Sequence, residues 1–481
     1  MTFVATLGGL LFGYDTAVIS GAVTSIDANF IDPQHLSETA RSSLSGWTVS
    51  SALLGCIIGA LVAGWVSNAI GRKGGMLVAG ALFLVSAAGS AYPEFGLGPI
   101  GGMGPAALTP FILYRILCGV GVGIASMLSP LYIAEIAPSR IRGRLVSFNQ
   151  LSIVLGMLLV YFVNWSIASQ GDEAWIRSTG WRLMLVSEAV PAVLFLGLLT
   201  LVPDTPRWFA MKGRHDKALA VLNRLVGDEE ARTTMREIEA SLVVPAHTGA
   251  GLFAFGSTVI VVGVLLSLFQ QFVGINAVLY YAPLMFKNLG ASTDSALMQT
   301  VIVGIANVIF TVAAILTVDR LGRKPLLIVG GLVMGVAMIT LGFLFQANSM
   351  GTGPLIAAIA YIAGFALSWG PVTWVLLSEM FPNSIKNKAM AIAVAAQWIA
   401  NLFVSWSFKI LIGNSALNAM FNHGFPYWVY GVMSFLAAAF VYFYVPETKR
   451  RSLEEIQDLW TRSDASRIRA GQSVSKQPVV G

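Results

Sequence analysis

Long apolar stretches recur along the whole chain and are separated by short polar segments. A helix that crosses a bilayer needs about 20 predominantly apolar residues. The pattern therefore predicts an all-α integral membrane protein with twelve transmembrane helices. They are expected at residues 3–24, 44–67, 75–93, 108–133, 146–168, 182–202, 252–286, 296–318, 326–346, 354–381, 389–411 and 425–445.

The loops after three helices of the first half recur, in the same order, in the second half. The recurring motifs, at separations of 251, 244 and 243 residues, are Gly71-Arg72-Lys73 with Gly322-Arg323-Lys324, Glu135 with Glu379, and Pro203-Asp204-Thr205 with Pro446-Glu447-Thr448. A repeat at nearly one offset indicates two six-helix, pseudo-symmetric halves in the same orientation. The predicted domains are an N-terminal half (1–202), a cytoplasmic helical linker (203–250), a C-terminal half (251–445) and a cytoplasmic tail (446–481).

The linker and the tail differ from the rest of the chain in being polar. Residues 217–222 and 235–239 have the pattern of short amphipathic helices on the inner face of the membrane. Residues 453–456 suggest one more short helix, and we expect disorder beyond Ser463.

Composition and charge support this interpretation. Of 481 residues, 56% are hydrophobic and 11% are charged, whereas soluble domains carry about 25% charged residues. The net charge of +6 does not indicate a nucleic-acid partner, because the 30 Lys and Arg residues are distributed unevenly. The predicted outer loops hold only Arg41, Arg177, Lys287 and Lys409. Such an excess on one side places both termini in the cytoplasm.

The sequence gives little support for a disulfide-stabilised, metal-binding or enzymatic protein. Cys56 and Cys118 fall inside predicted helices and are interpreted as small apolar residues, with neither disulfide nor metal-ligand spacing. No nucleotide loop, metal cluster or nucleophile–base arrangement suggests an enzyme or a bound cofactor, and no obligatory protein partner is evident. The first helix begins almost at Met1, so we expect no cleavable signal peptide, and a start further upstream stays open.

Three amides interrupt the apolar run at 252–286: Gln270, Gln271 and Asn276. A buried amide without partners costs roughly 2–7 kcal/mol, so lipid is a poor neighbour for it. In a straight helix, Gln271 and Asn276 would lie about 140° apart, but Gly274 between them permits a local break. A broken helix that lines a polar cavity is typical of transporter binding sites. The alternative is that the amides only join helices to one another.

Further polar and aromatic residues fall at mid-membrane depth in other helices. Gln150 lies in the fifth, Gly370-Pro371 forms a hinge one turn before Trp374 in the tenth, and Gln397 lies in the eleventh. Amides bond hydroxyl groups, and an indole stacks on the C–H face of a sugar ring. The combination indicates a polyhydroxylated ligand, although a lone Trp would indicate packing.

Three ionisable residues lie inside apolar spans. Asp15 belongs to the first helix, Arg115 to the fourth and Glu188 to the sixth. Intramembrane charges usually mark ion or proton pathways. Arg115 is the expected partner of Asp15, which leaves one acid unpaired, and burial favours its protonated form. The proton is thus the expected coupling ion. The alternative is a buried ion pair that only fixes helix packing.

The repeated loops place Arg or Lys beside acids on the cytoplasmic side. We expect carboxylate–cation pairs there to latch the halves together and to release as the halves rock. The alternative is positive-inside anchoring alone. The candidate latch residues are Arg72, Glu135, Arg142, Asp319, Arg323, Glu379 and Lys386.

Over essentially its whole length the chain resembles the sugar-porter family of the major facilitator superfamily. The resemblance rests on Gly71-Arg72-Lys73, Asp319-Arg320-Leu321-Gly322-Arg323-Lys324, Pro446-Glu447-Thr448, Gln270-Gln271 with Asn276, and Gly370-Pro371. Residues 8–21 and 374–379 are most similar to bacterial symporters that couple D-xylose to a proton. The resemblance implies proton coupling through Asp15, Arg115 and Glu188. It also implies sugar contacts from Gln150, Gln270, Gln271, Asn276, Tyr280, Gly370, Trp374 and Gln397.

The resemblance implies proton-coupled uptake of a monosaccharide, with D-xylose expected, across a bacterial plasma membrane by alternating access. Met157 stands where the xylose symporters have a sugar-contacting Gln, so the choice between xylose and glucose stays open. Lys386-Asn387-Lys388 replaces an Arg-Gly-Lys, and Asp204 replaces a Glu. The alternatives are a proton-independent facilitator, which Asp15 disfavours because facilitative relatives have Asn there, and a membrane sugar sensor, which would carry a longer tail.

Overall fold

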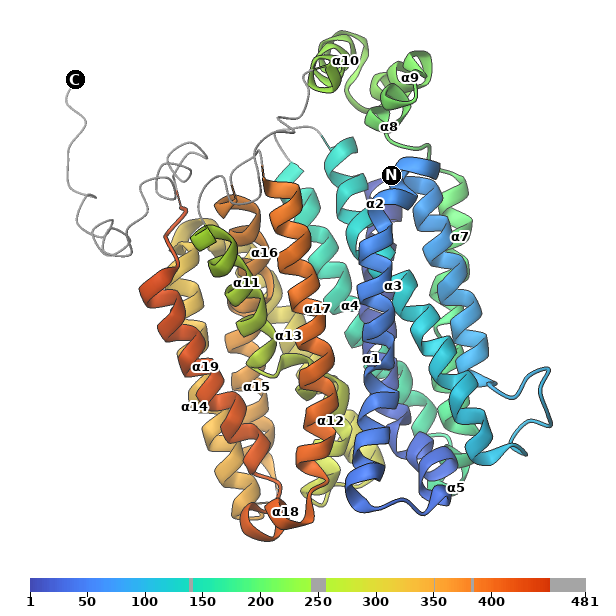
Figure 1. Ribbon diagram of the computed structural model, residues 1–481, viewed down its shortest axis with the longest axis vertical. Coiled ribbons are helices and arrows are strands. Elements are labelled where there is room, and N and C mark those ends of the chain that lie inside the picture. The colour runs from blue at the N-terminus through green and yellow to red at the C-terminus, as the bar shows by residue number, and fades with distance from the viewer. Residues whose placement is uncertain (138–141, 244–256, 350, 382–384, 450–481) are drawn as a thin grey trace. The chain divides into compact units, whose positions relative to one another are not determined.

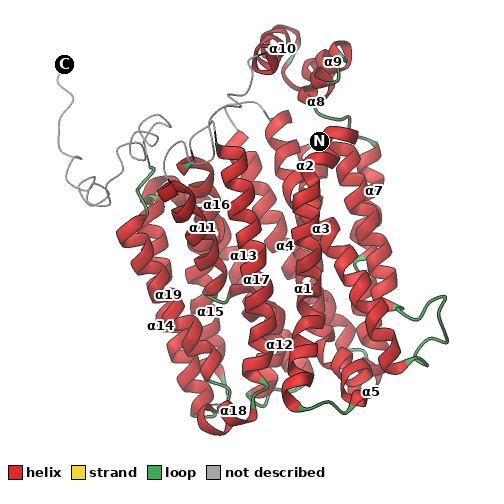
Figure 2. Cartoon of the chain, in the orientation of Figure 1, coloured by secondary structure: helices red, strands yellow, loops and turns green. Residues whose placement is uncertain are grey.

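The computed structural model describes residues 1–137, 142–243, 257–349, 351–381 and 385–449 (Figure 1). Every regular element in this part of the chain is a helix, as Figure 2 shows. The N-terminal α-helices are α1 (Thr2–Ile26), α2 (Glu38–Ala91), α3 (Leu108–Ile136), α4 (Arg142–Ala168), α5 (Glu173–Trp175), α6 (Trp181–Val186), α7 (Ala189–Thr200), α8 (Pro206–Met211), α9 (His215–Val226) and α10 (Asp228–Val243). The others are α11 (Ser257–Phe272), α12 (Ile275–Asn288), α13 (Thr293–Leu321), α14 (Arg323–Gln346), α15 (Thr352–Leu367), α16 (Trp369–Met380), α17 (Lys386–Ile412), α18 (Ser415–Phe421) and α19 (Phe425–Tyr444).

Short helices of other types fill some connections. They are the π-helices η1 (Asp27–Ile31) and η5 (Ile176–Gly180) and the 3₁₀-helices η2 (Asp32–Gln34) and η3 (Gly104–Ala107). The short helix expected at 453–456 lies outside the described residues.

Helix α2 contains two membrane spans. Eleven described segments are long and apolar enough to cross a membrane, and α2, with 54 residues, is far longer than one crossing needs. Gly71 interrupts it with a positive φ of 89°. A Cβ on Gly75 would lie 3.3 Å from Val66 Cγ1, although nine residues of straight helix span about 13.5 Å. The chain therefore reverses at Gly71, which confirms the twelve predicted spans.

Three of the expected spans are broken inside the membrane. The run at 252–286 divides into α11 and α12 at Gly274, whose φ is 92°, and this confirms the predicted break. The run at 354–381 divides into α15 and α16 at Ser368, two residues before the expected Gly370 hinge. The break between α6 and α7 at Ser187 and Glu188 was not predicted. Its signal is Pro191, which has no N–H to donate to the Ser187 carbonyl.

The chain forms two compact units, each with its own packing. The first comprises residues 1–245, 277–308 and 405–415, so it holds α1 to α10, most of α12, the start of α13 and the end of α17. The second comprises residues 246–276, 309–404 and 416–481. In the first unit α2 and α3 touch closely, since a Cβ on Gly119 would lie 1.8 Å from the Ala52 carbonyl oxygen. The domain boundaries drawn from the duplication stay a prediction.

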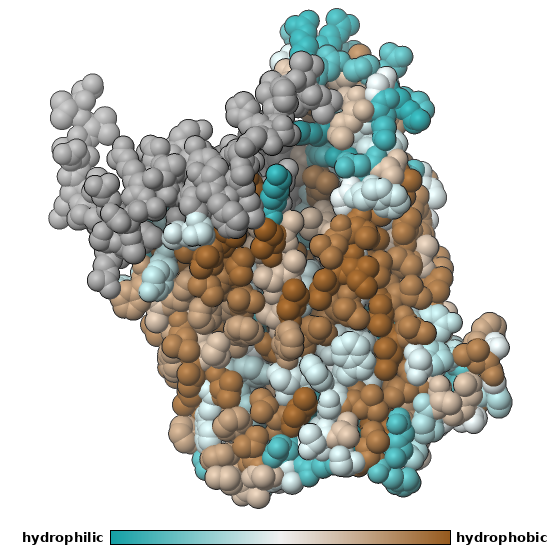
Figure 3. All heavy atoms as spheres, viewed as in Figure 1, coloured by the Kyte–Doolittle hydropathy of each residue, from teal (hydrophilic) through white to brown (hydrophobic). Residues whose placement is uncertain are grey.

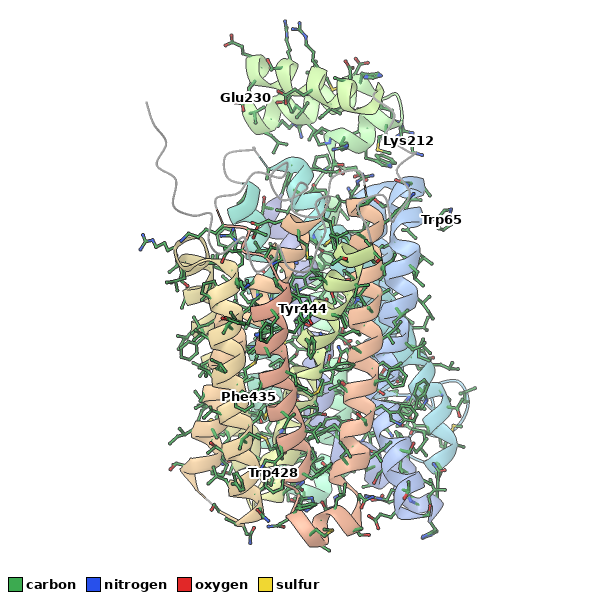
Figure 4. All side chains as sticks on the ribbon, turned by 60° about the vertical axis from the view of Figure 1, so that its left-hand side comes forward. Trp65, Lys212, Glu230, Trp428, Phe435 and Tyr444 are labelled. Atoms are coloured by element: carbon green, nitrogen blue, oxygen red, sulfur yellow. The ribbon has the colours of Figure 1, made fainter. Side chains whose placement is uncertain are left out.

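Large apolar side chains cover the exposed faces of the long helices. Leu61, Trp65 and Leu316 are each at least 70% exposed, and Figure 4 shows Trp65 projecting away from its helix. Figure 3 shows apolar residues over the helices and hydrophilic ones over α9 and α10. So much exposed apolar surface suits lipid as the neighbour. Helices α8 to α10 form a small cluster of their own around Ala210, Ala218, Leu222, Ala231 and Met235.

Candidate functional site

The first candidate site is a buried ion pair between α1 and α3. Arg115 Nη1 lies 2.5 Å from Asp15 Oδ1, and the two residues are 2% and 0% exposed. The other carboxylate oxygen, Asp15 Oδ2, is also buried and has no hydrogen-bond partner among the described residues. The pair that the sequence suggested is therefore formed, and it leaves one carboxylate oxygen available.

Glu188 joins this pair because of the break between α6 and α7. Tyr14, beside Asp15, shares a 2.8 Å hydrogen bond with Ser187, beside Glu188, so the break is held against α1. The Cys118 thiol, one turn after Arg115 on α3, donates to Glu188 Oε1 over 3.7 Å. One carboxyl oxygen each of Asp15 and Glu188 and the Cys118 sulfur all lie within 4.8 Å of one another.

These three groups could in principle ligate a metal ion. The Arg115 guanidinium already supplies the positive charge beside Asp15, so the donor set fits a site for protons better than one for a metal. The sequence interpretation treated Cys118 only as an apolar residue and missed its contact with Glu188. The signal was its position three residues after Arg115, which puts both on one helix face.

The second candidate site is a chain of amides at the break between α11 and α12. Gln270 Oε1 accepts from Gln271 Nε2 at 2.5 Å and from Gln397 Nε2 at 2.9 Å. Gln271 Oε1 accepts from Asn276 Nδ2 at 2.7 Å. The break at Gly274 thus brings Asn276 back to Gln271, although a straight helix would keep them apart. All four amides belong to the second unit.

Tyrosines hold this break in place. The Tyr361 hydroxyl donates to the Val273 carbonyl over 2.8 Å, which satisfies a backbone group released by the interruption. A Cβ on Gly274 would lie 2.4 Å from the Tyr430 ring, so the ring packs directly on the backbone. Gln397 Oε1, in the amide chain, and Thr373 Oγ1, on α16, are buried without a hydrogen-bond partner in the described part of the chain.

The remaining candidate sugar residues divide between the two units. Gly370 and Trp374 lie on α16 in the second unit, and Trp374 is half-buried. Gln150, on α4, and Tyr280, on α12, lie in the first unit. Their membership of one site with the amide chain stays a prediction.

The repeated motifs form two copies of one polar cluster, one in each half. In the first copy Arg72 Nη2 lies 2.8 Å from Glu135 Oε1, and the Thr205 hydroxyl donates to Glu135 Oε2 at 2.5 Å. Asp204 accepts from the backbone N–H groups of Arg72 at 3.1 Å and of Lys73 at 3.2 Å. Burial raises the pKa of Asp204 above its usual value, although these amides favour its ionised form.

The second copy reproduces the first atom by atom. Arg323 Nη2 lies 2.9 Å from Glu379 Oε1, and the Thr448 hydroxyl donates to Glu379 Oε2 at 2.5 Å. Glu447 accepts from the backbone N–H groups of Arg323 at 3.1 Å and of Lys324 at 3.0 Å. The separations of 251, 244 and 243 residues in sequence therefore correspond to equivalent contacts.

Both described pairs, Arg72 with Glu135 and Arg323 with Glu379, join loops of the same half. The role of these residues in latching the halves together stays a prediction. The side chains of Arg142, Asp319 and Lys386 lie outside the described residues.

Comparison with known proteins gives a consistent result. The family model described as Sugar (and other) transporter matches residues 1–460. The D-xylose-proton symporter of Escherichia coli (strain K12) is 54% identical over 469 residues, which cover 96% of this chain and 95% of the relative. The glucose facilitated diffusion protein of Zymomonas mobilis is 48% identical over 461 residues, covering 96% and 97%. A solved structure of the proton:xylose symporter XylE bound to 6-bromo-6-deoxy-D-glucose is 54% identical, with a TM-score of 0.82, over 95% of this chain and 98% of that one.

The chain belongs to the sugar porter family of the major facilitator superfamily. This sugar porter is a multi-pass membrane protein, and its family transports sugars rather than catalysing a reaction, as the sequence interpretation expected. The all-helical fold class, that of the major facilitator superfamily, is likewise that of this solved relative.

Two further buried ion pairs of this sugar porter were not predicted. Lys409 Nζ, near the end of α17, lies 2.9 Å from Asp27 Oδ2 in η1. The Arg182 guanidinium donates hydrogen bonds to both carboxylate oxygens of Glu94, at 2.8 and 2.9 Å. Lys409 had only been counted among the charges of the outer loops, and no spacing in the sequence relates it to Asp27.

Proposed function

We propose that this protein takes up a monosaccharide, D-xylose, together with a proton across the bacterial plasma membrane, by alternating access and with both termini in the cytoplasm. The observation that carries the proposal is the fully buried Asp15–Arg115 pair, in which one carboxylate oxygen is engaged and the other is unpartnered. Identity of 54% to a D-xylose-proton symporter supports the choice of sugar and of coupling ion.

The proton acts through the charge of this pair. While Asp15 is ionised, it compensates Arg115, and α1 and α3 are tied by a charge-assisted hydrogen bond. A proton placed on Asp15 Oδ2 removes the carboxylate charge and weakens that bond. Helix α1 can then move relative to α3, so the protonated carrier reorients. Loss of the proton on the other side restores the pair.

The sugar is recognised by the amide chain of Gln270, Gln271, Asn276 and Gln397. Each amide can both donate and accept, and so can each sugar hydroxyl. Sugar hydroxyls would replace amide–amide bonds at little cost and would engage the unpartnered Gln397 Oε1. We propose that Trp374, Gly370, Gln150 and Tyr280 complete the sugar site.

A second candidate function is proton-independent facilitation of glucose or xylose. It is favoured by the 48% identity to a glucose facilitated diffusion protein. The two functions share the sugar site and differ in their use of Asp15.

The test is sugar-induced alkalinisation of the medium around cells or vesicles, first with xylose and then with glucose. Wild type should take up protons with xylose, whereas Asp15→Asn should exchange sugar across the membrane without moving protons. Asp32→Asn is the matched control, because Asp32 is an exposed acid at the far end of the same helical segment. Sugar movement without a pH change in wild type would overturn the symport proposal and leave the facilitator.

A further inference from the structure

The Cys118 thiol forms a buried cluster with the carboxyl groups of Asp15 and Glu188 in the membrane-spanning part of the first unit. Its residue is fully buried, and its sulfur contacts Glu188 Oε1 at 3.7 Å. The Asp15 carboxylate belongs to the same cluster, and its oxygen Oδ2 is buried and has no hydrogen-bond partner among the described residues. We propose that Cys118 is a positioning residue for proton transfer between Glu188 and Asp15, a role that rests on the proton coupling proposed above.

Helix α3 presents two different donors from one face. Arg115 and Cys118 are three residues apart, so their side chains lie next to each other along the helix. Arg115 bonds Asp15 of α1, and Cys118 bonds Glu188 at the break between α6 and α7. One rigid helix thereby sets the separation of two carboxyl groups that belong to different segments.

The charges explain why one proton is shared. Two acids face one guanidinium, so a neutral cluster needs one acid ionised and one protonated. With Asp15 paired to Arg115, Glu188 carries the proton. In the transfer step the Glu188 O–H bond breaks and an O–H bond forms at Asp15 Oδ2. Cys118 keeps its own proton and donates to Glu188 Oε1, which stabilises the carboxylate that the departing proton leaves.

The other titratable groups described near this cluster are Tyr14 and Cys56. Tyr14 of α1 is bonded to Ser187, and Cys56 of α2 is fully buried near Asp15 and Arg115. Neither one supplies a described hydrogen bond to Glu188. The thiol of Cys118 is therefore the donor whose removal should change how readily Glu188 gives up its proton.

The functional test compares Cys118→Ala and Cys118→Ser with Cys56→Ala in proton-coupled sugar uptake measured across pH. Without the Cys118 thiol as a donor, the ionised form of Glu188 is less stable, so Glu188 and Asp15 keep their shared proton up to a higher pH. The midpoint of the pH profile should therefore rise by about 0.5 pH unit in Cys118→Ala, which is the size expected for a single modest hydrogen bond. Cys118→Ser, which retains a donor, should move it less, and Cys56→Ala should leave it in place.

An infrared measurement tests the contact without relying on transport. The S–H stretching band of Cys118, identified by its loss in Cys118→Ala, should lie below that of Cys56, because hydrogen bonding weakens the S–H bond. Replacing Glu188 by Leu should move it toward the Cys56 position.

The outcomes separate the two proposals. Two results would overturn the role of Cys118 alone, provided that wild type moves protons with sugar. One is a pH midpoint in Cys118→Ala equal to that in Cys56→Ala, and the other is a Cys118 S–H band that does not shift in Glu188→Leu. A wild type that moves sugar without protons overturns the proposed function, and this role with it.

Discussion

Lys409 and Asp27, 382 residues apart in sequence, form a buried ion pair with 2.9 Å between Nζ and Oδ2. The second oxygen of Asp27 accepts from the Ser45 hydroxyl at 2.5 Å, so the carboxylate is fully engaged. Nearby, the Trp406 indole donates to the Ser43 carbonyl at 3.0 Å. These contacts attach the end of α17 to the ends of α1 and α2, and they explain why residues 405–415 pack with the first unit.

This pair should behave as a charge-dependent clamp. Removing one member leaves the other charge buried without compensation, which costs about 3 kcal/mol or more, whereas replacing both is often nearly neutral. Lys409→Met and Asp27→Asn should therefore each lower the thermal midpoint of the purified protein markedly, and the double variant should recover most of the loss. Thermal unfolding of all four proteins in one detergent measures this.

The exposed pair Arg41–Asp32 provides the control for that cycle. Its side chains are 45% and 43% exposed, and exposed pairs contribute at most about 1 kcal/mol. Arg41→Met should thus change little. Additive losses in the Lys409 and Asp27 double variant would show that the buried pair does not act as a unit.

The amide chain predicts a graded loss of sugar affinity. Gln270 Oε1 accepts from two other amides, whereas Gln397 contributes one donor to it, so Gln270 organises the cluster. Gln270→Ala should weaken sugar binding about thirtyfold and Gln397→Ala about fivefold, with each lost hydrogen bond worth roughly 1 kcal/mol.

Equilibrium binding of xylose to detergent-solubilised protein checks this order. Gln299→Ala is the control, because the Gln299 amide bonds Ser295 one turn away on α13. Unchanged affinity in Gln270→Ala would move the sugar site away from the break at Gly274.

The duplicated polar clusters predict unequal effects of equivalent mutations. The Arg72–Glu135 side chains are 7% and 8% exposed, whereas those of Arg323–Glu379 are 11% and 28% exposed. Solvent weakens the second pair more, so Glu135→Gln should destabilise by up to about 3 kcal/mol and Glu379→Gln by less. Thermal midpoints would decide this, with Glu230→Gln on α10 as an exposed control, and a larger loss in Glu379→Gln would contradict the argument.

Glu94 should make the stability of the fold depend on pH under acidic conditions. Burial acts to raise its pKa, but the two hydrogen bonds from Arg182 and the N–H of Gly101 outweigh burial, and the pKa is lowered below its usual value. A carboxyl whose pKa is lower in the folded state stabilises the fold above the unfolded pKa, about 4.3. That stability disappears as pH falls through the folded pKa.

The stability difference between wild type and Glu94→Gln should therefore be constant near neutral pH and shrink below about pH 4.3. Thermal midpoints recorded from pH 7 to pH 3.5 would test it. A difference that stays constant down to the lowest pH would show that Glu94 is not held ionised by Arg182.

Features that depend on local sequence could be predicted. Apolar length located the spans, and a glycine between amides located the break at Gly274. The nearly equal separations of the repeated motifs indicated the duplication that the two equivalent clusters reflect, because duplication preserves spacing. The break at Ser187 was missed, although Pro191 was its signal, since proline often lies in membrane helices without ending them.

Features that depend on which distant segments meet could not be predicted. Nothing in the spacing relates Asp27 to Lys409, and the helical spacing of Arg115 and Cys118, although it puts both on one face, does not show that this face meets Glu188. For the same reason the sequence did not show that Arg72 pairs with Glu135 and Arg323 with Glu379, each within its own half. Charge signs constrain partners, but only packing selects among them.

The single-residue reversal at Gly71 bears on how the chain is made. Because the turn between the second and third spans is so short, we expect the two spans to enter the bilayer together as one hairpin. The positive charges of Arg72 and Lys73, directly after the turn, should then keep it on one side of the membrane. Asp204, synthesised more than a hundred residues later, then closes on those two backbone N–H groups, so the turn acquires its final bonds only when the first half is complete.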